Sequence, residues 1–133
     1  MKTKSNTQIE LRRSALIHLS VEARTLREQR IKEASTERDL LYWSSIRIND
    51  IIADRYRKES GANVFKSFQQ WQREGFRVRK GEKAYVLWSK KRNVTKSAGE
   101  NEEPNEISYK FFPIAYLFSD LQVEPQKEFS DAN

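Results

Sequence analysis

The spacing of apolar residues predicts that the first half of the chain is helical. Apolar side chains recur there at intervals of three, four and seven residues, at Ile9, Leu16, Leu19, Ala23 and Leu26. This repeat is typical of one helix face and predicts a helix over residues 8–33. Because the segment is rich in charge and poor in large apolar side chains, we expect it to be a projecting arm or a dimer contact.

A second helix is predicted over residues 37–60. Ser35 and Thr36 precede Glu37 and Asp39, and a hydroxyl cap followed by acids in the first turn is typical of a helix N-terminus. Gly61 follows the last periodic residue and ends the helix. The predicted helix has a wide apolar face for burial, formed by Leu40, Leu41, Trp43, Ile48, Ile51, Ile52 and Tyr56.

A short helix is predicted after this pair. Ser67-x-x-Gln70 has the form of a capping box, and Gly75 stands where a helix C-cap is expected. These signals place Phe68 and Trp71 on a helix of about two turns.

Two long strands are predicted in the rest of the chain. After a glycine turn at Lys80-Gly81, residues 83–91 alternate as a strand with apolar side chains on both faces, as in a central strand. Residues 107–118 form the second strand, in which Pro113 removes one hydrogen-bond donor and predicts a bulge or an edge position. Residues 93–106 between the strands are polar and acidic, and we expect a flexible connection there.

Together these elements predict an α+β fold, with N-terminal helices packed on a small antiparallel sheet and a short helix before the first long strand. We expect Trp71, Val78 and Phe112 to belong to the core, because aromatic and β-branched residues on such elements are usually buried.

Charge is distributed unevenly along the 133 residues, whose net charge is +6. Residues 1–92 carry 22 Lys and Arg against 11 Asp and Glu, a net charge of +11, whereas residues 93–133 carry a net charge of −5. A basic surface joined to an acidic tail favours a polyanion as partner. The basic segments lack a strongly apolar opposite face, so we expect no membrane binding.

The side chains needed for most catalytic and metal sites are missing. The sequence has no cysteine, its only histidine is His18, and its four glycines are too scattered for a phosphate-binding loop. We therefore expect no enzyme activity, no catalytic residues, no metal and no cofactor. The N-terminus has no apolar run typical of a signal peptide and no segment could span a bilayer, which predicts a cytoplasmic protein.

One segment combines aromatic and cationic side chains. Residues 65–92 carry a net charge of +7 and include Phe68, Trp71, Phe76, Tyr85 and Trp88. Rings that stack on bases and cations that hold phosphates are what a protein needs to bind a single-stranded nucleic acid. The alternative interpretation is a half-buried strand and helix whose rings are core and whose cations are merely solvated.

Several short motifs resemble the N-terminal domain of the ArdC antirestriction proteins. They are Phe68-x-x-Trp71, Gly75, Val78-x-Lys80-Gly81-Glu82-Lys83 and a late aromatic strand that ends Tyr116-x-Phe118-x-x-x-Gln122-Val123. The resemblance covers residues 64–124. The family's usual Asn in the last motif is replaced by Ser119, and its usual upstream Trp and Tyr-x-Gly-x-Asn elements are not recognisable.

The resemblance implies binding of single-stranded DNA that enters a cell on a mobile element during conjugative transfer. RNA is the other nucleic acid left open. Full-length members carry a metallopeptidase domain with an H-E-x-x-H motif, which this sequence lacks, so no peptidase activity is carried over. The predicted organisation is an N-terminal helical arm at 1–35, an ArdC N-terminal-like domain at 36–124 and a disordered tail at 125–133.

The candidate nucleic-acid-binding residues are the cations around the glycine turn and along the first strand, together with three rings. They are Arg73, Arg77, Arg79, Lys80, Lys83, Tyr85, Trp88, Lys90, Lys91, Arg92 and Tyr109. The alternative function is a protein-interaction module that docks an acidic partner or forms a homodimer through the N-terminal helix. A further alternative is that the protein assembles with a separately encoded partner protein.

Overall fold

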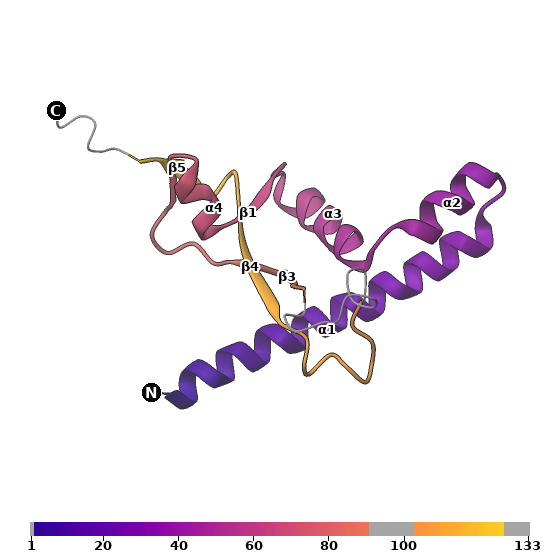
Figure 1. Ribbon diagram of the computed structural model, residues 1–133, viewed down its shortest axis with the longest axis horizontal. Helices are drawn as coiled ribbons and strands as arrows, with labels where there is room; N and C mark the ends of the chain where they lie inside the picture. The colour runs from indigo at the N-terminus through magenta and orange to yellow at the C-terminus, as the bar shows by residue number, and fades with distance from the viewer. Residues whose placement is uncertain (1, 91–102, 127–133) are drawn as a thin grey trace.

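The chain has an α+β fold of four helices and five short strands in the residues that the computed structural model describes, 2–90 and 103–126 (Figure 1). In chain order these are α1 (Lys2–Glu33), α2 (Glu37–Ser45), α3 (Ile48–Ser60), β1 (Phe65–Ser67), α4 (Phe68–Arg73), β2 (Phe76–Val78), β3 (Tyr85–Trp88), β4 (Ile114–Ser119) and β5 (Val123–Pro125). The expected fold class is confirmed. No helix in the described ranges combines the length and apolarity that crossing a membrane requires.

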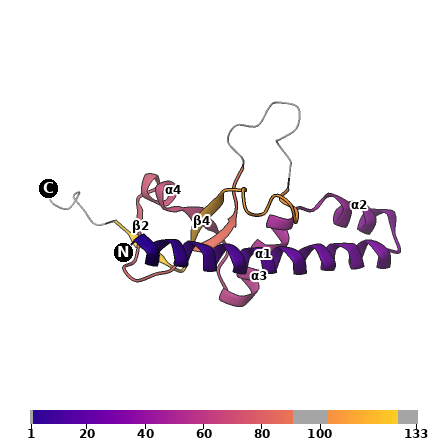
Figure 2. The same cartoon turned by 90° about the horizontal axis from the view of Figure 1, so that it is seen from below.

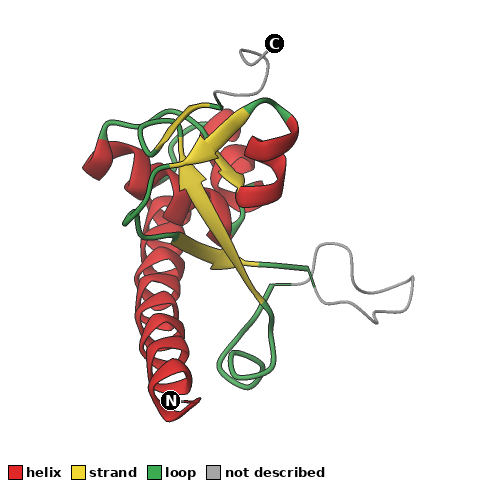
Figure 3. Cartoon of the chain, turned by 90° about the vertical axis from the view of Figure 1, so that its left-hand side faces the viewer, coloured by secondary structure: helices red, strands yellow, loops and turns green. Residues whose placement is uncertain are grey.

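The strands form two small antiparallel sheets. The larger has the order β1-β4-β3, so β4 is central, as Figure 3 shows. In its register Tyr85 pairs with Leu117 and Trp88 pairs with Ile114. The smaller sheet joins β2 to β5, with Val78 opposite Val123.

Helix α1 supplies part of the core rather than a detached arm. Its Leu16 is fully buried and its Ala23 nearly so, both within one apolar cluster with Ile48, Ile52 and Trp88. Between these two positions of α1, the buried Ser20 hydroxyl accepts a 2.8 Å hydrogen bond from the Trp88 indole N–H and donates to the Leu16 carbonyl. The expectation of a projecting helix therefore fits only its ends, which extend beyond the sheet in Figure 1.

Arginines on α1 hold the segment that precedes β4. Arg13 donates to the carbonyls of Tyr109 and Phe112, at 2.8 Å each, and Arg24 donates to the Pro104 carbonyl. Arg27 donates to the Ile46 carbonyl at 2.9 Å and pairs with the carboxylate of Glu103.

These arginines explain two differences from the predicted connection. Residues 103–106 do not belong to a free linker, because Glu103 also accepts a 2.8 Å hydrogen bond from the Ile48 N–H at the start of α3. Residues 91–102 lie outside the described residues. At the C-terminus the predicted tail begins too early, since Pro125 belongs to β5 and the Gln126 N–H donates to the Gly75 carbonyl.

The predicted helix over residues 37–60 is two helices. As expected, Thr36 caps the first of them by accepting from the Asp39 N–H. The chain then becomes extended at Ile46 and Arg47, and a new helix begins where the Asp50 carboxylate accepts from the Arg47 N–H at 3.2 Å. The capping hydrogen bond to the Asp50 carboxylate starts a new helix at this point, although the apolar spacing continues through residues 37–60.

The strands are shorter than predicted. The first spans Tyr85–Trp88 rather than 83–91, and residues 107–112 form turns before β4 begins at Ile114. Pro113 stands at this boundary, where its carbonyl accepts from the Ser89 N–H. The turns let Tyr109 fold back onto Trp88, with ring planes 14° apart and centroids 5.5 Å apart.

We predict that Ser20→Ala destabilises the protein. The variant leaves the buried Trp88 indole N–H without its acceptor, which should lower the free energy of unfolding by about 1–3 kcal/mol. Urea denaturation followed by tryptophan fluorescence measures this change. Ser44→Ala, at an exposed site on α2, is the control and should stay within about 0.5 kcal/mol of wild type. Equal stability of all three proteins would contradict the role of Ser20.

Candidate nucleic-acid interface

The predicted glycine turn lies between β2 and β3. Gly81 has φ 87°, a left-handed conformation that glycine adopts without steric cost, and the Glu82 N–H donates to the Arg79 carbonyl at 3.3 Å. This turn directs Lys80 and Lys83 outward at the end of β3.

A single buried glutamine fastens this turn to the end of β4. The Gln122 side-chain N–H₂ donates to the Lys83 carbonyl at 2.8 Å and to the Glu82 carboxylate at 3.2 Å. Its side-chain oxygen accepts from the Ser119 N–H at 2.7 Å. The two motifs that carry the family resemblance are therefore in direct contact, across 40 residues of sequence.

Arg79 has a structural role that the sequence did not indicate. Its guanidinium donates to the carbonyls of Leu121 and Val123 and pairs with Glu82, so its hydrogen-bonding capacity is directed into the protein. We therefore remove Arg79 from the expected phosphate contacts. Arg77 is more exposed but forms an ion pair with Glu124 across the β2–β5 sheet at 2.8 Å.

Four predicted cations remain available to a ligand. Arg73, Lys80, Lys83 and Lys90 are exposed, and none has an acid partner among the described residues. Lys91 and Arg92 lie outside the described residues. The free positive charge thus lies at the end of α4, on the glycine turn and just after β3.

Two of the three predicted stacking rings are in the core. Trp88 and Tyr109 are each 5% exposed and stack on one another, so neither can present its face to a base in this conformation. Tyr85 is half-buried against Tyr56 and Phe65, with centroids 4.8 and 5.0 Å away. These placements correct the expected role of Trp88 and Tyr109. Sequence alternation could not distinguish the faces, because β3 is covered on both sides.

The expected core rings are confirmed. Trp71 and Phe112 are buried, and the Trp71 indole N–H donates to the Phe118 carbonyl at 2.8 Å. Val78 is half-buried beneath the same turn.

An exposed ring on β4 was not among the expected site residues. Tyr116 is 37% exposed, and the Arg12 guanidinium of α1 lies over its ring at 5.7 Å from the centroid. Because side chains alternate along a strand, Phe118 projects from the same face, next to its cross-strand neighbour Lys66. We call these four residues the Tyr116 face. The Phe-Phe-Pro-Ile-Ala-Tyr run contained the signal, but only the structure distinguishes its buried ring, Phe112, from its exposed rings, Phe111 and Tyr116.

The fold and these surfaces define a small α+β domain with unpaired cations around a glycine turn and a cation–ring face on its sheet. The chain belongs to the family described as the N-terminal domain of anti-restriction factor ArdC, which matches residues 43–118, more than half of the sequence. At the family level this membership suggests DNA binding connected with antirestriction. No curated protein and no solved structure matches the chain.

The hydrogen bonds of Asp120, just after β4, predict a pH dependence of stability. Asp120 follows β4, and hydrogen bonds from the Val64 and Asn63 N–H groups hold the pKa of its carboxyl below the ordinary 3.8. Since the pKa is lowered by folding, the carboxylate stabilises the fold above 3.8, and this contribution is lost as pH falls through the folded-state pKa.

We therefore predict that Asp120→Asn unfolds more easily than wild type at pH 7, and that the two proteins converge in stability near about pH 2. Urea denaturation at both pH values measures the difference. Glu106→Ala, at an exposed carboxylate with no partner among the described residues, should follow wild type at each pH. A constant gap between Asp120→Asn and wild type would contradict the linkage.

Proposed function

We propose that this chain is a non-enzymatic protein of the cytoplasm that binds single-stranded DNA in an antirestriction process linked to a mobile element. The observation that carries the proposal is membership of the ArdC N-terminal family over residues 43–118. The free cations and the Tyr116 face supply the chemistry that an unpaired strand needs.

In this proposal phosphates bind at the glycine turn. Lys80 and Lys83 belong to a turn whose backbone is held in place. The Gln122 side chain donates to the Lys83 carbonyl and to the Glu82 carboxylate. Arg73, Lys90 and the sequence-adjacent Lys91 and Arg92 extend the positive charge on either side. RNA contains the same phosphates, so binding measured with matched DNA and RNA oligonucleotides distinguishes the two ligands.

Bases stack on Tyr116 in place of the two rings that are buried. Arg12 already lies over this ring, so a base can enter beside a guanidinium that also attracts phosphate. Arginine and tyrosine planes are suited to binding without sequence preference, because every base presents a π face.

No catalytic step is assigned. Burial raises the pKa of the Tyr56 hydroxyl to about 12, and its proton is donated to the Val86 carbonyl at 2.8 Å. This shift has a purely structural cause, since the hydroxyl joins α3 to the sheet.

We predict that Lys80→Ala/Lys83→Ala weakens binding to a labelled poly-dT oligonucleotide uniformly across sequences. Each lost phosphate contact should reduce the slope of log K against log salt by about 0.7. Fluorescence anisotropy at several salt concentrations measures both quantities. Lys32→Ala/Lys110→Ala removes the same charge at exposed sites on α1 and on the turn before β4 and should leave the slope unchanged. Identical slopes for the two double variants would refute the turn as a phosphate site.

We predict that Tyr116→Ala lowers affinity for the same oligonucleotide by about 1–3 kcal/mol, through loss of base stacking. Tyr116→Phe retains the ring and should bind nearly as well as wild type. Circular dichroism checks that both variants fold. If Tyr116→Ala folds and binds with wild-type affinity, the Tyr116 face is not the base platform.

A further inference from the structure

Helix α2 buries none of its own side chains, although four of its nine residues are large and apolar. Leu40, Leu41 and Tyr42 are 43%, 63% and 56% exposed, and Trp43 is half-buried. An amphipathic helix of this length is marginal in water without a surface to pack against. Figure 2 shows α2 beside the C-terminal end of α1, and this contact leaves Leu40, Leu41 and Tyr42 exposed to solvent.

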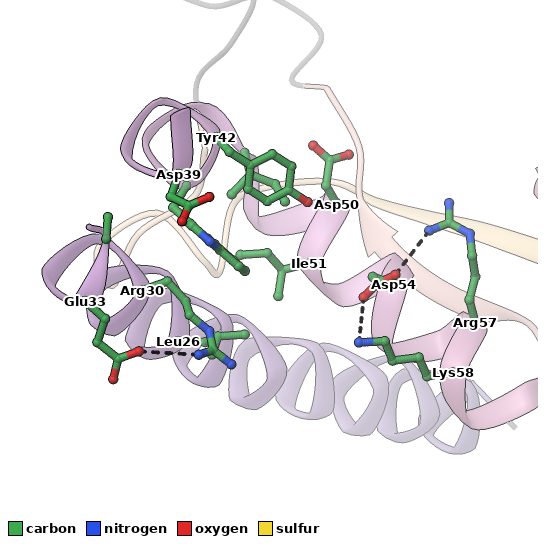
Figure 4. A pocket seen from close by; sticks show the side chains of 13 residues that line it. Leu26, Arg30, Glu33, Asp39, Tyr42, Asp50, Ile51, Asp54, Arg57 and Lys58 are labelled. Atoms are coloured by element: carbon green, nitrogen blue, oxygen red, sulfur yellow. Dashed lines mark hydrogen bonds and ion pairs between the residues drawn. The ribbon is translucent and has the colours of Figure 1, made fainter. Parts of the chain in front are cut away.

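A groove of about 600 Å³ lies directly beside this apolar surface. It is bounded by α1, α2 and α3, and Figure 4 shows Leu26 and Ile51 on its inner side with Tyr42 at its edge. A smaller hollow of about 230 Å³ between α1 and α3 shares Leu26 and Ile51 with it, so the apolar lining extends along both helices. The volume is sufficient to receive several side chains.

The charges around the groove have both signs. Within the groove Arg30 pairs with Glu33, and Asp54 pairs with Lys58 at 3.2 Å. Asp39 and Asp50 at the edge have no cationic partner among the described residues.

Two cations at the same end of the molecule have no acid partner in the described part of the chain. These are Arg38 and Arg47, which are one residue from Asp39 and three residues from Asp50 respectively. A two-fold contact requires a surface that is complementary to itself, and unpaired charges of both signs on one surface supply the groups that such a contact needs.

We propose that this surface, comprising α2 and the adjoining groove, is the contact through which two copies of the chain form a homodimer. The exposed leucines of one α2 enter the groove of the other copy, and the reverse contact forms by symmetry. Arg38 and Arg47 then face Asp39 and Asp50 of the other copy. Nucleic acid is a poorer match for this surface, because its unpaired acids, Asp39 and Asp50, offset its unpaired cations, Arg38 and Arg47, and leave no excess of positive charge to hold phosphates.

The proposed contact differs from the dimer expected from the sequence, which used the helix at residues 8–33. The middle of α1 is committed to the core through Leu16 and Ala23, so a contact along the whole helix is not available, and the proposed contact uses its C-terminal end beside α2. The surface spans the start of the family match at residue 43, since Leu40, Leu41 and Tyr42 precede it and much of the groove lining lies within it. None of the described residues of the proposed DNA site lines the groove, so the proposed dimer contact and the DNA site are separate surfaces.

The test is the mass of the full chain in solution, by size-exclusion chromatography with light scattering and by sedimentation equilibrium. Wild type should have twice the monomer mass. Leu41→Glu places a charge at the centre of the contact in both copies and should raise the dimer dissociation constant about tenfold or more. Since Leu41 is exposed in the monomer, circular dichroism should not change, and the unfolding midpoint should fall only by the stabilisation that dimerisation gives to wild type at the same concentration.

Ile107→Glu is the matched control, because it introduces the same charge at an apolar residue that is 85% exposed on a distant turn. It should retain the wild-type dimer. A monomeric wild type, or a Leu41→Glu variant that dimerises as well as wild type, would overturn the proposal. Loss of affinity for a short oligonucleotide in Leu41→Glu, without a change in mass, would assign the surface to nucleic acid and also overturn it.

Discussion

The contact between α1 and the sheet is the interaction on which the rest of the structure depends. The Ser20 hydroxyl satisfies the Trp88 indole at the centre of the core. Arg13 and Arg24 donate to backbone carbonyls of residues 104–112, and Arg27 holds the Ile46 carbonyl and the Glu103 carboxylate. Buried carbonyls that lack a partner destabilise a fold, and these guanidinium groups supply the missing donors from a neighbouring helix. Hydrogen bonds from α1 therefore stabilise the three-stranded sheet in addition to the hydrogen bonds between its own strands.

The contact between α1 and the sheet also shows that the folded core extends beyond the residues that match the family. The match spans residues 43–118, yet Leu16, Ser20 and Ala23 complete the core from before it and Gln122 fixes the glycine turn from after it. The family match suggests DNA binding connected with antirestriction, whereas the flanking segments hold the matched residues in a fixed shape.

Local chemistry was predictable from the sequence wherever a short motif fixed it. The cap at Thr36, the capping serine at 67 and the glycine of the Lys80-Gly81 turn are all present as expected. The α+β class was predictable because apolar residues are spaced as in helices in the first half of the chain and as in strands after the glycine turn. The exposure of rings was not predictable, because Trp88 and Tyr109 stack through a turn that resembled a continuing strand. Nor was the role of Arg79, since no local pattern indicates that distant carbonyls will occupy a guanidinium.

The Gln122 amide has a consequence for how this surface can evolve. One side chain bonds to the backbone at Lys83 and at Ser119, and to the carboxylate of Glu82, so two segments about 40 residues apart in sequence are constrained together. A substitution at Gln122 would release the glycine turn from the end of β4, and a change in the turn would leave the amide without its partners. We therefore expect substitutions at Gln122 and in the glycine-turn motif to occur together.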